Sequence, residues 1–562
     1  MTNYTIIGID FGTSTTVVKV KNYYDGMKNN ECQSLVVNNS TVIPTLVFER
    51  SVDHQLFFGA DADTEFNNNT EGTLYRNFKM DLLQKDPEAL EKAKFLVKEF
   101  MKYLYRQFSI QKAQLNVCEI IKTYISYPAK WTPEIISFMK QSVIDAGFGT
   151  TDNVFGETEP TAAIYATFTN HADALKQHRL VTQDVPINVM MLDMGAGTSD
   201  VTIFRFLADR QNQFHIGVDG KIISHPAVDN RYLCGGREVD KMLCEYNMDY
   251  MRSIVPEAML GGFSSTNESG TKTWKERNVS PCLLQDTPAT TPGHVMSFIK
   301  NAKFFYPQLS TAAPFPEIDR KAFEDLTKEH WRQLHTLVTD AISKAAVVIP
   351  EIKGPEDIDL LIVTGGHSQW YCVRELCLGR SIAGLPPIGF KKIIADPERL
   401  LSEARPQETV ANGLIFTDLP FEINHSSSNN LWLQIILDEN NQSPVYQPVD
   451  MFDSLPAQKK IVWNKVIKAG SFCMESVKLR CVCCYGATID DGVVSSHEAD
   501  VPLNNLFTVL GKMLFLPLFL RSDEEYKISV TLDVRIDEDG SGHIIGTFDV
   551  LGGGNRVFSI KL

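Results

Sequence analysis

The chain has no excess of basic residues and no long uninterrupted hydrophobic run. It carries 54 Lys and Arg against 69 Asp and Glu, a formal net charge of -15. Because a general nucleic-acid binder needs cations to neutralise phosphates, this balance argues against that class and against binding to membrane surfaces. The most apolar window, residues 506–520, contains Gly511 and Pro517 and is too short to span a bilayer. We therefore expect no nucleic-acid partner and no membrane span.

The sequence also lacks paired cysteine motifs and a leader-like N-terminus. Its 11 cysteines are scattered, and Cys481, Cys483 and Cys484 form the only cluster. No second CxxC or His pair lies nearby to complete a tetrahedral zinc site, so buried free thiols are favoured over a metal site. The first residues have no basic region and lead directly into a strand pattern, so we expect no signal peptide. Free thiols suit a reducing compartment, and we predict a cytoplasmic protein.

At 562 residues the chain is too long for a single hydrophobic core. A hydrophobic content of 43% and a charged content of 22% are typical of globular proteins. Strand and helix patterns alternate up to residue 418, residues 419–430 are a polar linker, and residues 431–562 have mainly strand patterns. We predict an α/β domain, a linker and a β-rich domain with these boundaries.

Two segments combine an apolar strand, an aspartate and a glycine turn. Residues 6–19 begin with a strand that ends at Asp10, and residues 189–206 begin with a strand that ends at Asp193. A second strand pattern follows each turn, so each segment is predicted to be a β-hairpin. The polar and small residues after the two aspartates are Gly12, Thr13 and Ser14 in the first segment and Gly195, Ala196, Gly197, Thr198 and Asp200 in the second.

The composition of these turns favours a phosphate site. Glycine lets the backbone approach a ligand closely, and successive backbone N–H groups can form a concavity that binds anions. Asp10 and Asp193 would repel a phosphate unless a cation lay between them, so the pair suggests bound Mg²⁺. Neither turn is a Walker loop, because no Gly-Lys-Ser/Thr follows the glycines. For either segment alone, an ordinary hairpin with a glycine turn is the alternative.

Two further glycine pairs follow the same logic. Gly235 and Gly236 precede a helix start, where backbone donors can reach a phosphate. Gly365 and Gly366 end a buried-type strand immediately before His367.

Hydrophobic periodicity predicts the other elements. Thr158 is a candidate N-cap of a helix that starts at Glu159, whereas residues 170–185 are predicted to be a loop. Residues 261–293 are rich in Ser, Thr, Gly and Pro and are predicted to be a surface insertion or mobile loop. The predicted helices cover residues 88–107, 133–146, 294–305, 320–324, 329–348 and 408–415, and the clearest predicted hairpin joins residues 526–536 to 543–551.

Five segments, in order, resemble the nucleotide-binding domain of the seventy-kilodalton heat-shock chaperones. This family belongs to the superfamily that includes actin and the sugar kinases. The resemblance implies a two-lobed, actin-like ATPase fold (a duplicated ribonuclease-H-like α/β fold) over residues 1–418. It also implies a sandwich-like β domain without a helical lid over residues 431–562. The five segments are GIDFGTSTTVV, TYISYPAKW with FGETEPTAAIYA, LDMGAGTSDVTI, LIVTGGHSQW and RPQETVANG.

The resemblance implies roles for individual residues. Asp10 and Asp193 would hold Mg²⁺ through water, and Lys79 would stabilise charge that develops on the γ-phosphoryl group of ATP. A solvated surface lysine is the alternative reading of Lys79. Glu159 and Asp200 would orient the attacking water or the metal. The implied catalytic residues are Lys79, Glu159, Thr198 and Asp200, and the implied ATP- or ADP-binding residues are Gly12, Thr13, Ser14, Gly195, Ala196, Gly197, Gly235, Gly236, Lys303, Gly365, Gly366 and His367.

The chain also departs from the family pattern. Phe304 and Gln369 stand where the family has two arginines that pack on adenine, which opens the question of base preference. Ile136 replaces an arginine of the inter-domain relay, although Pro128 is kept. The family's acidic, leucine-containing linker is absent. This pattern resembles the divergent lineage related to the twelfth heat-shock subfamily.

The resemblance implies an ATP-binding, chaperone-like protein that hydrolyses ATP slowly with Mg²⁺. Residues 431–562 would bind a client or partner protein, and co-chaperones would assist. The alternative is a scaffold or signalling adaptor that binds ATP with negligible turnover. A small-molecule kinase would need an acceptor pocket for which the sequence shows no signature. In an actin-like filament, the extra β domain would have to fit along the polymer.

Overall fold

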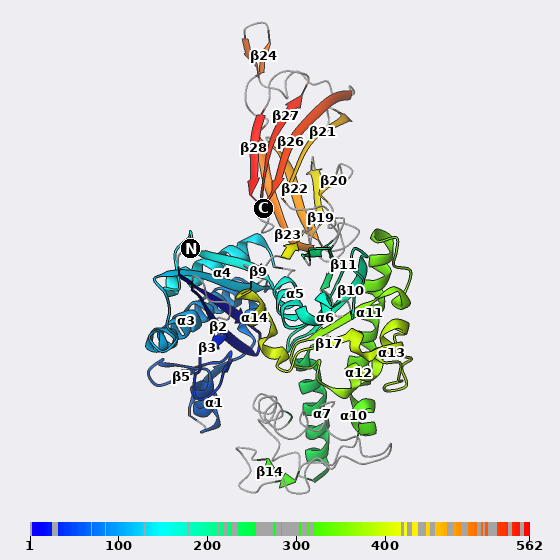
Figure 1. Cartoon of the computed structure of the whole chain (residues 1–562). Helices are drawn as coiled ribbons and strands as arrows, with labels where there is room; N and C mark the ends of the chain where they lie inside the picture. The colour runs from blue at the N-terminus through cyan, green and yellow to red at the C-terminus, as the bar shows by residue number, and fades with distance from the viewer. Residues whose placement is uncertain are drawn as a thin grey trace. The chain divides into compact units, whose positions relative to one another are not determined.

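The structure, a computed structural model, is of the mixed α/β class and divides into two compact units (Figure 1). The first unit is Met1–Pro128, Met139–His215 and Ser224–Glu422, and the second is Ala129–Phe138, Ile216–Ile223 and Ile423–Leu562. The described residues are 3–24, 32–68, 70–84, 86–128, 131–177, 179–211, 213–217, 222–226, 234–254, 275, 283, 303–304, 313–314, 320–416, 421–423, 430–436, 446–449, 456–468, 476–484, 493–502, 507–509, 512–514, 525–537, 542–550 and 556–561.

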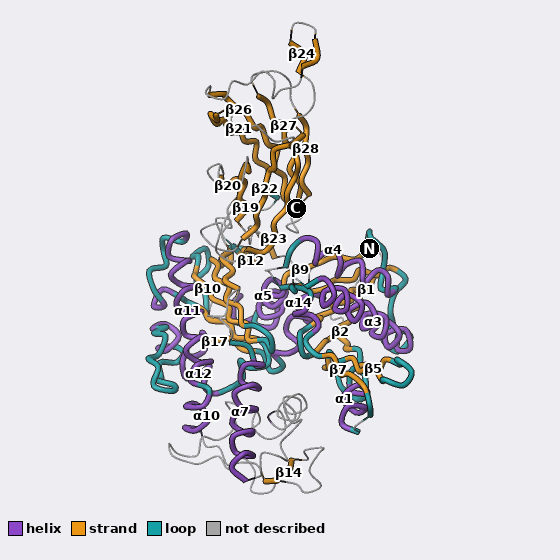
Figure 2. The backbone as a smooth tube through the Cα atoms, turned by 180° about the vertical axis from the view of Figure 1, so that it is seen from behind, coloured by secondary structure: helices purple, strands orange, loops and turns teal. Residues whose placement is uncertain are grey.

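Figure 2 shows the helices and strands coloured by secondary structure. The helices are α1 (Ala60–Asn67), α2 (Phe78–Asp81), α3 (Pro87–Gln111), α4 (Pro133–Ala146), α5 (Glu159–Asn170), α6 (Ala172–Lys176), α7 (Gly236–Ile254), α10 (Arg320–Leu326), α11 (Lys328–Val348), α12 (Tyr371–Cys377), α13 (Lys391–Ala395) and α14 (Thr409–Leu414), with 3₁₀ turns η5 (Pro355–Asp357), η6 (Pro397–Arg399) and η7 (Pro406–Glu408). The strands up to residue 423 are β1 (Tyr4–Phe11), β2 (Thr15–Tyr23), β3 (Cys32–Ser34), β4 (Val42–Pro44), β5 (Val47–Arg50), β6 (Leu56–Phe58), β7 (Gly72–Tyr75), β8 (Ile120–Tyr127), β9 (Val154–Thr158), β10 (Ile187–Met194), β11 (Ser199–Ala208), β12 (Phe214–Ile216), β13 (Ile222–Pro226), β14 (Lys303–Phe304), β15 (Ala313–Pro314), β16 (Leu360–Thr364), β17 (Leu400–Ser402) and β18 (Phe421–Ile423). The later strands are β19 (Asn430–Ile436), β20 (Tyr446–Val449), β21 (Ala457–Lys468), β22 (Ser476–Cys484), β23 (Val493–Pro502), β24 (Phe507–Val509), β25 (Lys512–Leu514), β26 (Glu525–Ile536), β27 (Gly542–Val550) and β28 (Arg556–Lys561).

Two sheets of the first unit share one topology. In the first sheet the strand order includes β3-β2-β1-β8-β9, and in the second it includes β12-β11-β10-β16-β17. In each, an antiparallel hairpin (β1/β2 or β10/β11) continues into two parallel strands. The repeat predicted for two hairpins therefore extends to the sheets around them.

A helix follows the last strand of each repeat, and these two helices pack against each other. Strand β9 leads into α5 and β17 leads into α14, and the two helices lie side by side in both views (Figures 1 and 2). A Cβ atom on Gly413 would lie 1.6 Å from the carbonyl oxygen of Ala162, so this approach requires glycine. Thr158 caps α5 as predicted, because its side chain accepts a hydrogen bond from the N–H of Thr161.

The C-terminal part of the second unit consists of strands in its described residues. Two four-stranded sheets have the orders β20-β19-β22-β23 and β21-β26-β27-β28. The predicted hairpin is confirmed as β26 and β27, with Ile536 facing Gly542 at the turn. Leu532, Val534 and Ile544 are buried whereas Arg535 is exposed, which is the alternation of a sheet with one covered face. Cys481 is a buried cysteine in the thiol form.

Three local predictions need correction. Residues 172–176, predicted to lie in a loop, form helix α6, since Ala-Asp-Ala-Leu-Lys is rich in good helix formers. Residues 294–302 lie outside the described residues, and Lys303–Phe304, predicted to end a helix there, is strand β14. Consecutive aromatic residues before Pro307 favour an extended backbone. Residues 261–293 were predicted to be on the surface, but the two described ones, Lys275 and Leu283, are buried.

The other helices match their predictions closely. The predicted helix over residues 88–107 is α3, which begins behind the Asp86 cap and extends to Gln111. Those predicted over residues 320–324, 329–348 and 408–415 are α10, α11 and α14.

Candidate functional site

The two hairpins place their aspartates at equivalent positions. In β1/β2, Asp10 faces Val17 and the next pair, Phe11 and Thr16, closes the turn. In β10/β11, Asp193 faces Asp200, and Met194 and Ser199 close the turn. Residues 12–15 and 195–198 are therefore matching turns, each one residue pair beyond its aspartate.

The tips of the two hairpins meet in space. A Cβ atom on Gly197 would lie 3.0 Å from the hydroxyl of Thr13 and 3.3 Å from the sulfur of Met80. The turn of the second hairpin thus lies against both the turn of the first hairpin and helix α2. Because Met80 adjoins Lys79 on α2, the lysine is brought to the same place.

Lys79 is buried rather than solvated, so its reading as a surface lysine is wrong. Its ammonium group donates a hydrogen bond to the Glu159 carboxylate at 2.6 Å, and Glu159 is the first residue of α5. The pair joins the short helix that follows β7 to the helix that follows β9. A cation and a carboxylate are therefore held together next to the two turns.

Burial and nearby negative charge disfavour the ionised form of Asp10. Burial raises its pKa to about 7, and the negative charge of Glu159 adds to this rise. Lys79 and a hydrogen bond from the Ser126 hydroxyl, at 2.8 Å, act in the opposite direction. Near neutral pH this side chain is thus divided between its protonated and ionised forms, and a nearby cation would favour the ionised one.

Asp193 lies in the same electrostatic environment. Burial raises its pKa well above the ordinary value, and the charges of Glu159, Asp200 and Asp10 raise it further. Lys79 is the group that lowers it. The structure thus brings together Asp10, Glu159, Asp193, Asp200 and Lys79, so one described lysine faces four carboxylates.

These residues fit a hydrated Mg²⁺ ion. In the described part of the chain no group of three or more His, Cys, Asp or Glu residues is arranged to hold a metal ion. Mg²⁺ prefers hard oxygen ligands, keeps several of its waters and is commonly held by one or two carboxylates. Asp10 and Asp193 supply such oxygens, and because burial raises the pKa of both carboxyl groups, a cation beside them would stabilise their ionised forms. Thr198 lies in the second turn, residues 195–198, and its hydroxyl donates to the Asp200 carboxylate at 3.2 Å.

Gly235 and Gly236 lie against the second turn and support it. The N–H of Gly236 donates to the carbonyl of Gly195 at 3.1 Å, and the N–H of Arg237 donates to that of Ala196 at 2.8 Å. A Cβ atom on Gly235 would lie 2.5 Å from the Gly197 carbonyl oxygen, so glycine is needed for this contact. A carbonyl of the turn thus accepts the hydrogen bond of the Gly236 N–H, and the expected role of the two glycines in phosphate binding stays a prediction.

The segment from Gly365 to His367 lies against the second hairpin and α7. Gly365 has a φ of 82°, and a Cβ atom there would lie 2.6 Å from the Asp193 carboxylate. The N–H of His367 donates to the Met194 carbonyl at 3.3 Å, and a Cβ atom on Gly236 would lie 1.7 Å from the His367 ring. Gly365 therefore lies beside the charged cluster and His367 packs on Gly236, whereas a Cβ atom on Gly366 would lie 3.6 Å from the Gln407 side chain.

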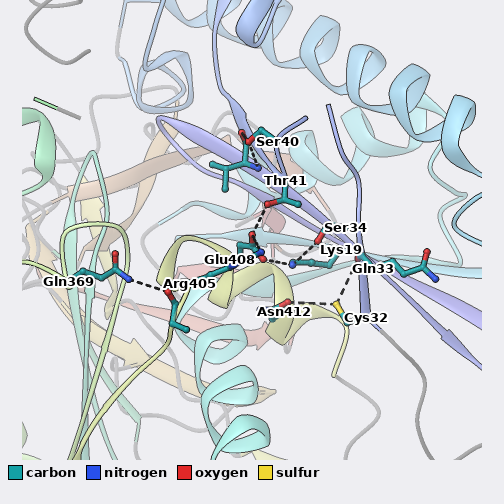
Figure 3. A network of polar contacts seen from close by, with 12 residues as sticks. Lys19, Cys32, Gln33, Ser34, Ser40, Thr41, Gln369, Arg405, Glu408 and Asn412 are labelled. Atoms are coloured by element: carbon teal, nitrogen blue, oxygen red, sulfur yellow. Dashed lines mark hydrogen bonds and ion pairs between the residues drawn. The ribbon is translucent and has the colours of Figure 1, made fainter. Parts of the chain in front are cut away.

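The remaining predicted positions are those expected at the adenine base and in the inter-domain relay. Gln369 donates to the backbone carbonyl of Ala404 at 3.3 Å (Figure 3). Lys303 belongs to strand β14, and the predicted base-lining helix is not formed at its described residues. Ile136 is buried on α4.

Sequence reasoning missed a second buried Lys–Glu pair (Figure 3). Lys19 of β2 forms an ion pair with Glu408 and also donates to the Ser34 hydroxyl at 2.8 Å. The Thr41 hydroxyl donates to Glu408 at 2.7 Å, and Arg405 lies 3.4 Å from the same carboxylate oxygen. The sequence does contain a signal for this pair: both helices have a glutamate at their start, Glu159 as the first residue of α5 and Glu408 as the residue before α14.

Comparison with known proteins assigns no family. No protein-family model matches the chain, and a search of curated proteins finds no match. None of the helices in the described ranges is long and apolar enough to cross a membrane.

Proposed function

We propose that the first unit binds ATP with Mg²⁺ and hydrolyses it slowly, as in the heat-shock-70-like proteins that its motifs resemble. The observation that carries this proposal is the meeting of Asp10, Lys79 and Glu159 with Asp193 at the tips of two equivalent hairpins. We further propose that the two repeated sheets are the lobes of an actin-like ATPase fold. Their shared topology and the pairing of α5 with α14 support this.

Each group would have a defined task. Asp10 and Asp193 would hold Mg²⁺ through its waters, and the ion would neutralise charge on the phosphates. Lys79 would stabilise the charge that develops on the γ-phosphoryl oxygens, and Glu159 would orient the lysine and the attacking water. Positioning and electrostatic stabilisation are sufficient for phosphoryl transfer to water, and no covalent intermediate is needed.

The β-rich part of the second unit would bind a client or partner protein. Its two four-stranded sheets and the lack of a helix among its described residues beyond Asn430 support a lidless β domain. In this proposal, nucleotide state in the first unit changes the affinity of the second for its client. Co-chaperones and a cytoplasmic location belong to the same proposal.

One observation favours the alternative, a nucleotide-dependent scaffold with negligible turnover. Lys79 is already bonded to Glu159, and this pairing reduces the positive charge that the lysine offers to a phosphate. If ATP does not separate the pair, binding would proceed without hydrolysis.

Single-turnover hydrolysis of γ-labelled ATP with Mg²⁺ tests the proposal. Removing one charge-stabilising donor from an active site costs about 100-fold or more in rate, so Lys79→Ala should release phosphate about 100-fold more slowly than the parent. Thr198→Ala should be slowed about 10-fold, the loss of about one hydrogen bond to a charged group. Lys92→Ala serves as the control, because Lys92 of α3 pairs with Glu49 of β5, outside the charged cluster.

The possible outcomes separate the candidates. Phosphate release that depends on Lys79 and Thr198 but not on Lys92 would support an ATPase. Tight ATP binding without release would favour the scaffold. If the parent does not bind ATP at all, the nucleotide proposal is wrong and only the fold proposal survives.

A further inference from the structure

A buried threonine, Thr45, lies beneath the first turn. It follows β4 and is fully buried. Its N–H donates to the carbonyl of Ser14 at 2.9 Å, and its hydroxyl donates to the carbonyl of Gly12 at 2.9 Å. One residue outside the hairpin therefore holds two carbonyl groups of the same turn.

The hydroxyl of Thr45 is itself fixed. It lies 2.9 Å from the hydroxyl of Thr16, which is also fully buried. Because the Thr45 hydroxyl has a single hydrogen and gives it to Gly12, the Thr16 hydroxyl must be the donor to Thr45. This ordered chain leaves the Gly12 carbonyl a single favourable direction.

Fixing these carbonyls also fixes the N–H groups that follow them. In a planar trans peptide the C=O of one residue and the N–H of the next point in opposite directions. With the Gly12 and Ser14 carbonyls directed toward Thr45, the N–H groups of Thr13 and Thr15 point away from it. Backbone N–H groups that point to the same side of a turn can together bind an anion.

The second turn is supported in the same way by a different donor. Its first glycine carbonyl, that of Gly195, accepts from the N–H of Gly236, and the next carbonyl accepts from Arg237. By the same peptide geometry the N–H groups of Ala196 and Gly197 point away from α7. Two turns of equal register thus have their carbonyls fixed from outside, one by a threonine and one by a helix start.

We propose that Thr45 is a positioning residue for nucleotide binding. It aims the Thr13 and Thr15 N–H groups at the phosphates, without touching the nucleotide itself. This inference rests on the proposed function of the first unit. It predicts that the Thr45 hydroxyl affects affinity for the phosphate part of a nucleotide and not for the nucleoside.

Binding of ATP and of adenosine to the full chain, both with Mg²⁺, tests this role in matched variants. Thr45→Val keeps the shape of the side chain but removes the donor, so the Gly12 carbonyl is left unsatisfied and free to turn. We expect ATP affinity to fall about 10-fold, which is the effect of about one hydrogen bond, while adenosine affinity stays unchanged. Thr45→Ser keeps the hydroxyl and should bind ATP within about two-fold of the parent.

Thr5→Val is the control for a buried hydroxyl in the same hairpin. Thr5 is fully buried near the other end of β1, donates to Asn22 at 2.6 Å and accepts from the N–H of Cys118 at 2.8 Å. It should lower the melting temperature as Thr45→Val does but leave ATP affinity unchanged. If Thr45→Val does not fold, Thr45→Cys replaces it, because a thiol has similar volume and is only a weak donor.

Each outcome decides the inference. ATP affinity that falls in Thr45→Val and returns in Thr45→Ser, with adenosine unaffected, supports it. Unchanged ATP affinity, an equal loss for ATP and adenosine, or an equal loss in Thr5→Val would overturn it while leaving ATP binding by the parent in place. A parent that binds adenosine but gains nothing from the phosphates of ATP, or binds neither, would overturn the inference together with the proposed function.

Discussion

The two hairpins share a backbone arrangement but differ in several of the side chains around it. Asp10 faces an apolar partner, Val17, whereas Asp193 faces a second acid, Asp200. Helix α2 adds Lys79 beside the first hairpin. The comparison shows that a repeated scaffold fixes where the carboxylates stand, while their surroundings decide the charge of each half of the site.

The strand next to each hairpin shows the same division. Ile9 faces Ile125 in the first sheet, so Asp10 and Ser126 are the next residues of their two strands, and Ser126 donates to Asp10. In the second sheet Asp193 faces Thr364, whose hydroxyl is 3.4 Å from the Pro406 carbonyl instead. A hydroxyl stands at the same register in both sheets, but only the first is bonded to its aspartate.

The helices that follow the two repeats extend the comparison. Each has a glutamate at its start, and each glutamate is paired with a buried lysine: Glu159 with Lys79 and Glu408 with Lys19. The Glu159 side chain is 16% exposed and lies at the proposed site, whereas the Glu408 side chain is 4% exposed. We infer that one copy of this pair has a functional role and the other a structural one.

The largest effect should come from breaking the more buried pair. Burial alone would raise the pKa of Glu408, but hydrogen bonds from Lys19 and Thr41 and the charge of Lys19 lower it below its ordinary value. Glu408→Gln leaves Lys19 buried without its counter-charge and should lower the free energy of unfolding by about 3 kcal/mol. Glu159→Gln should cost about 1 kcal/mol, since the Glu159 side chain is less buried than that of Glu408 and Lys79 keeps the charges of Asp10 and Asp193 beside it. Urea denaturation of both variants measures the difference.

The double variant Lys19→Met with Glu408→Leu is the control for this prediction. It removes both charges, and apolar replacements of a buried pair are often close to neutral in stability. An equal destabilisation by Glu408→Gln and Glu159→Gln would contradict the division into a structural and a functional pair.

Acid should loosen the second repeat before the first. His330 lies on α11, which packs against β11, and it is fully buried; burial lowers its pKa to about 3, helped by the charge of Lys275, which is itself paired with Asp240. The unfolded chain binds a proton at this histidine below about pH 6.5 but the folded protein does not, so stability is lost as the pH falls below that value. At pH 5 the loss should be about 2 kcal/mol, from about 1.5 pH units at 1.36 kcal/mol each.

Hydrogen exchange between pH 7 and pH 5 measures this effect. Amides of β10 and β11 should lose protection before those of β1 and β2, and His330→Leu should remove the difference. A parallel loss in both hairpins, or a pH dependence that persists in His330→Leu, would show that another group is responsible.

Sequence reasoning located what depends on local pattern. Periodicity, capping and turn chemistry over a few residues predict several features correctly. These are the glycine turns after Asp10 and Asp193, the Thr158 cap, the core helices and the β26/β27 hairpin. It missed what depends on long-range contact. The pairing of Lys19 with Glu408 joins residues 389 positions apart, and the support of Gly12 by Thr45 has no local signature.

The errors have a similar cause. The helix start at Gly236 was expected to bring backbone donors to a phosphate, and its position alone did not reveal that a carbonyl of the turn accepts the hydrogen bond of the Gly236 N–H. Lys275 was placed at the surface because its segment is polar, yet it is buried against Asp240 and over the ring of Trp370. Composition reports the average environment of a segment and cannot identify the one residue in it that has a buried partner.

The smallest effect separates the two hydroxyls that stand beside the aspartates. The hydrogen bond from Ser126 lowers the pKa of Asp10, so Ser126→Ala should raise that pKa above about 7. At pH 7 more of Asp10 would then be protonated, and Mg²⁺ affinity in the presence of ADP should fall about five-fold, or about 1 kcal/mol. At pH 9 the carboxylate would be mostly ionised in both proteins, so the deficit should nearly vanish.

Thr364→Val is the matched variant in the second sheet and should leave Mg²⁺ affinity within about two-fold of the parent, because the lost hydroxyl is bonded to a carbonyl rather than to Asp193. Calorimetric titration at both pH values measures all three proteins. An equal loss in the two variants would mean that the sheets support their aspartates alike and that the asymmetry has no energetic consequence. A loss in Ser126→Ala that does not change with pH would mean that Ser126 acts on the shape of the site rather than on the ionisation of Asp10.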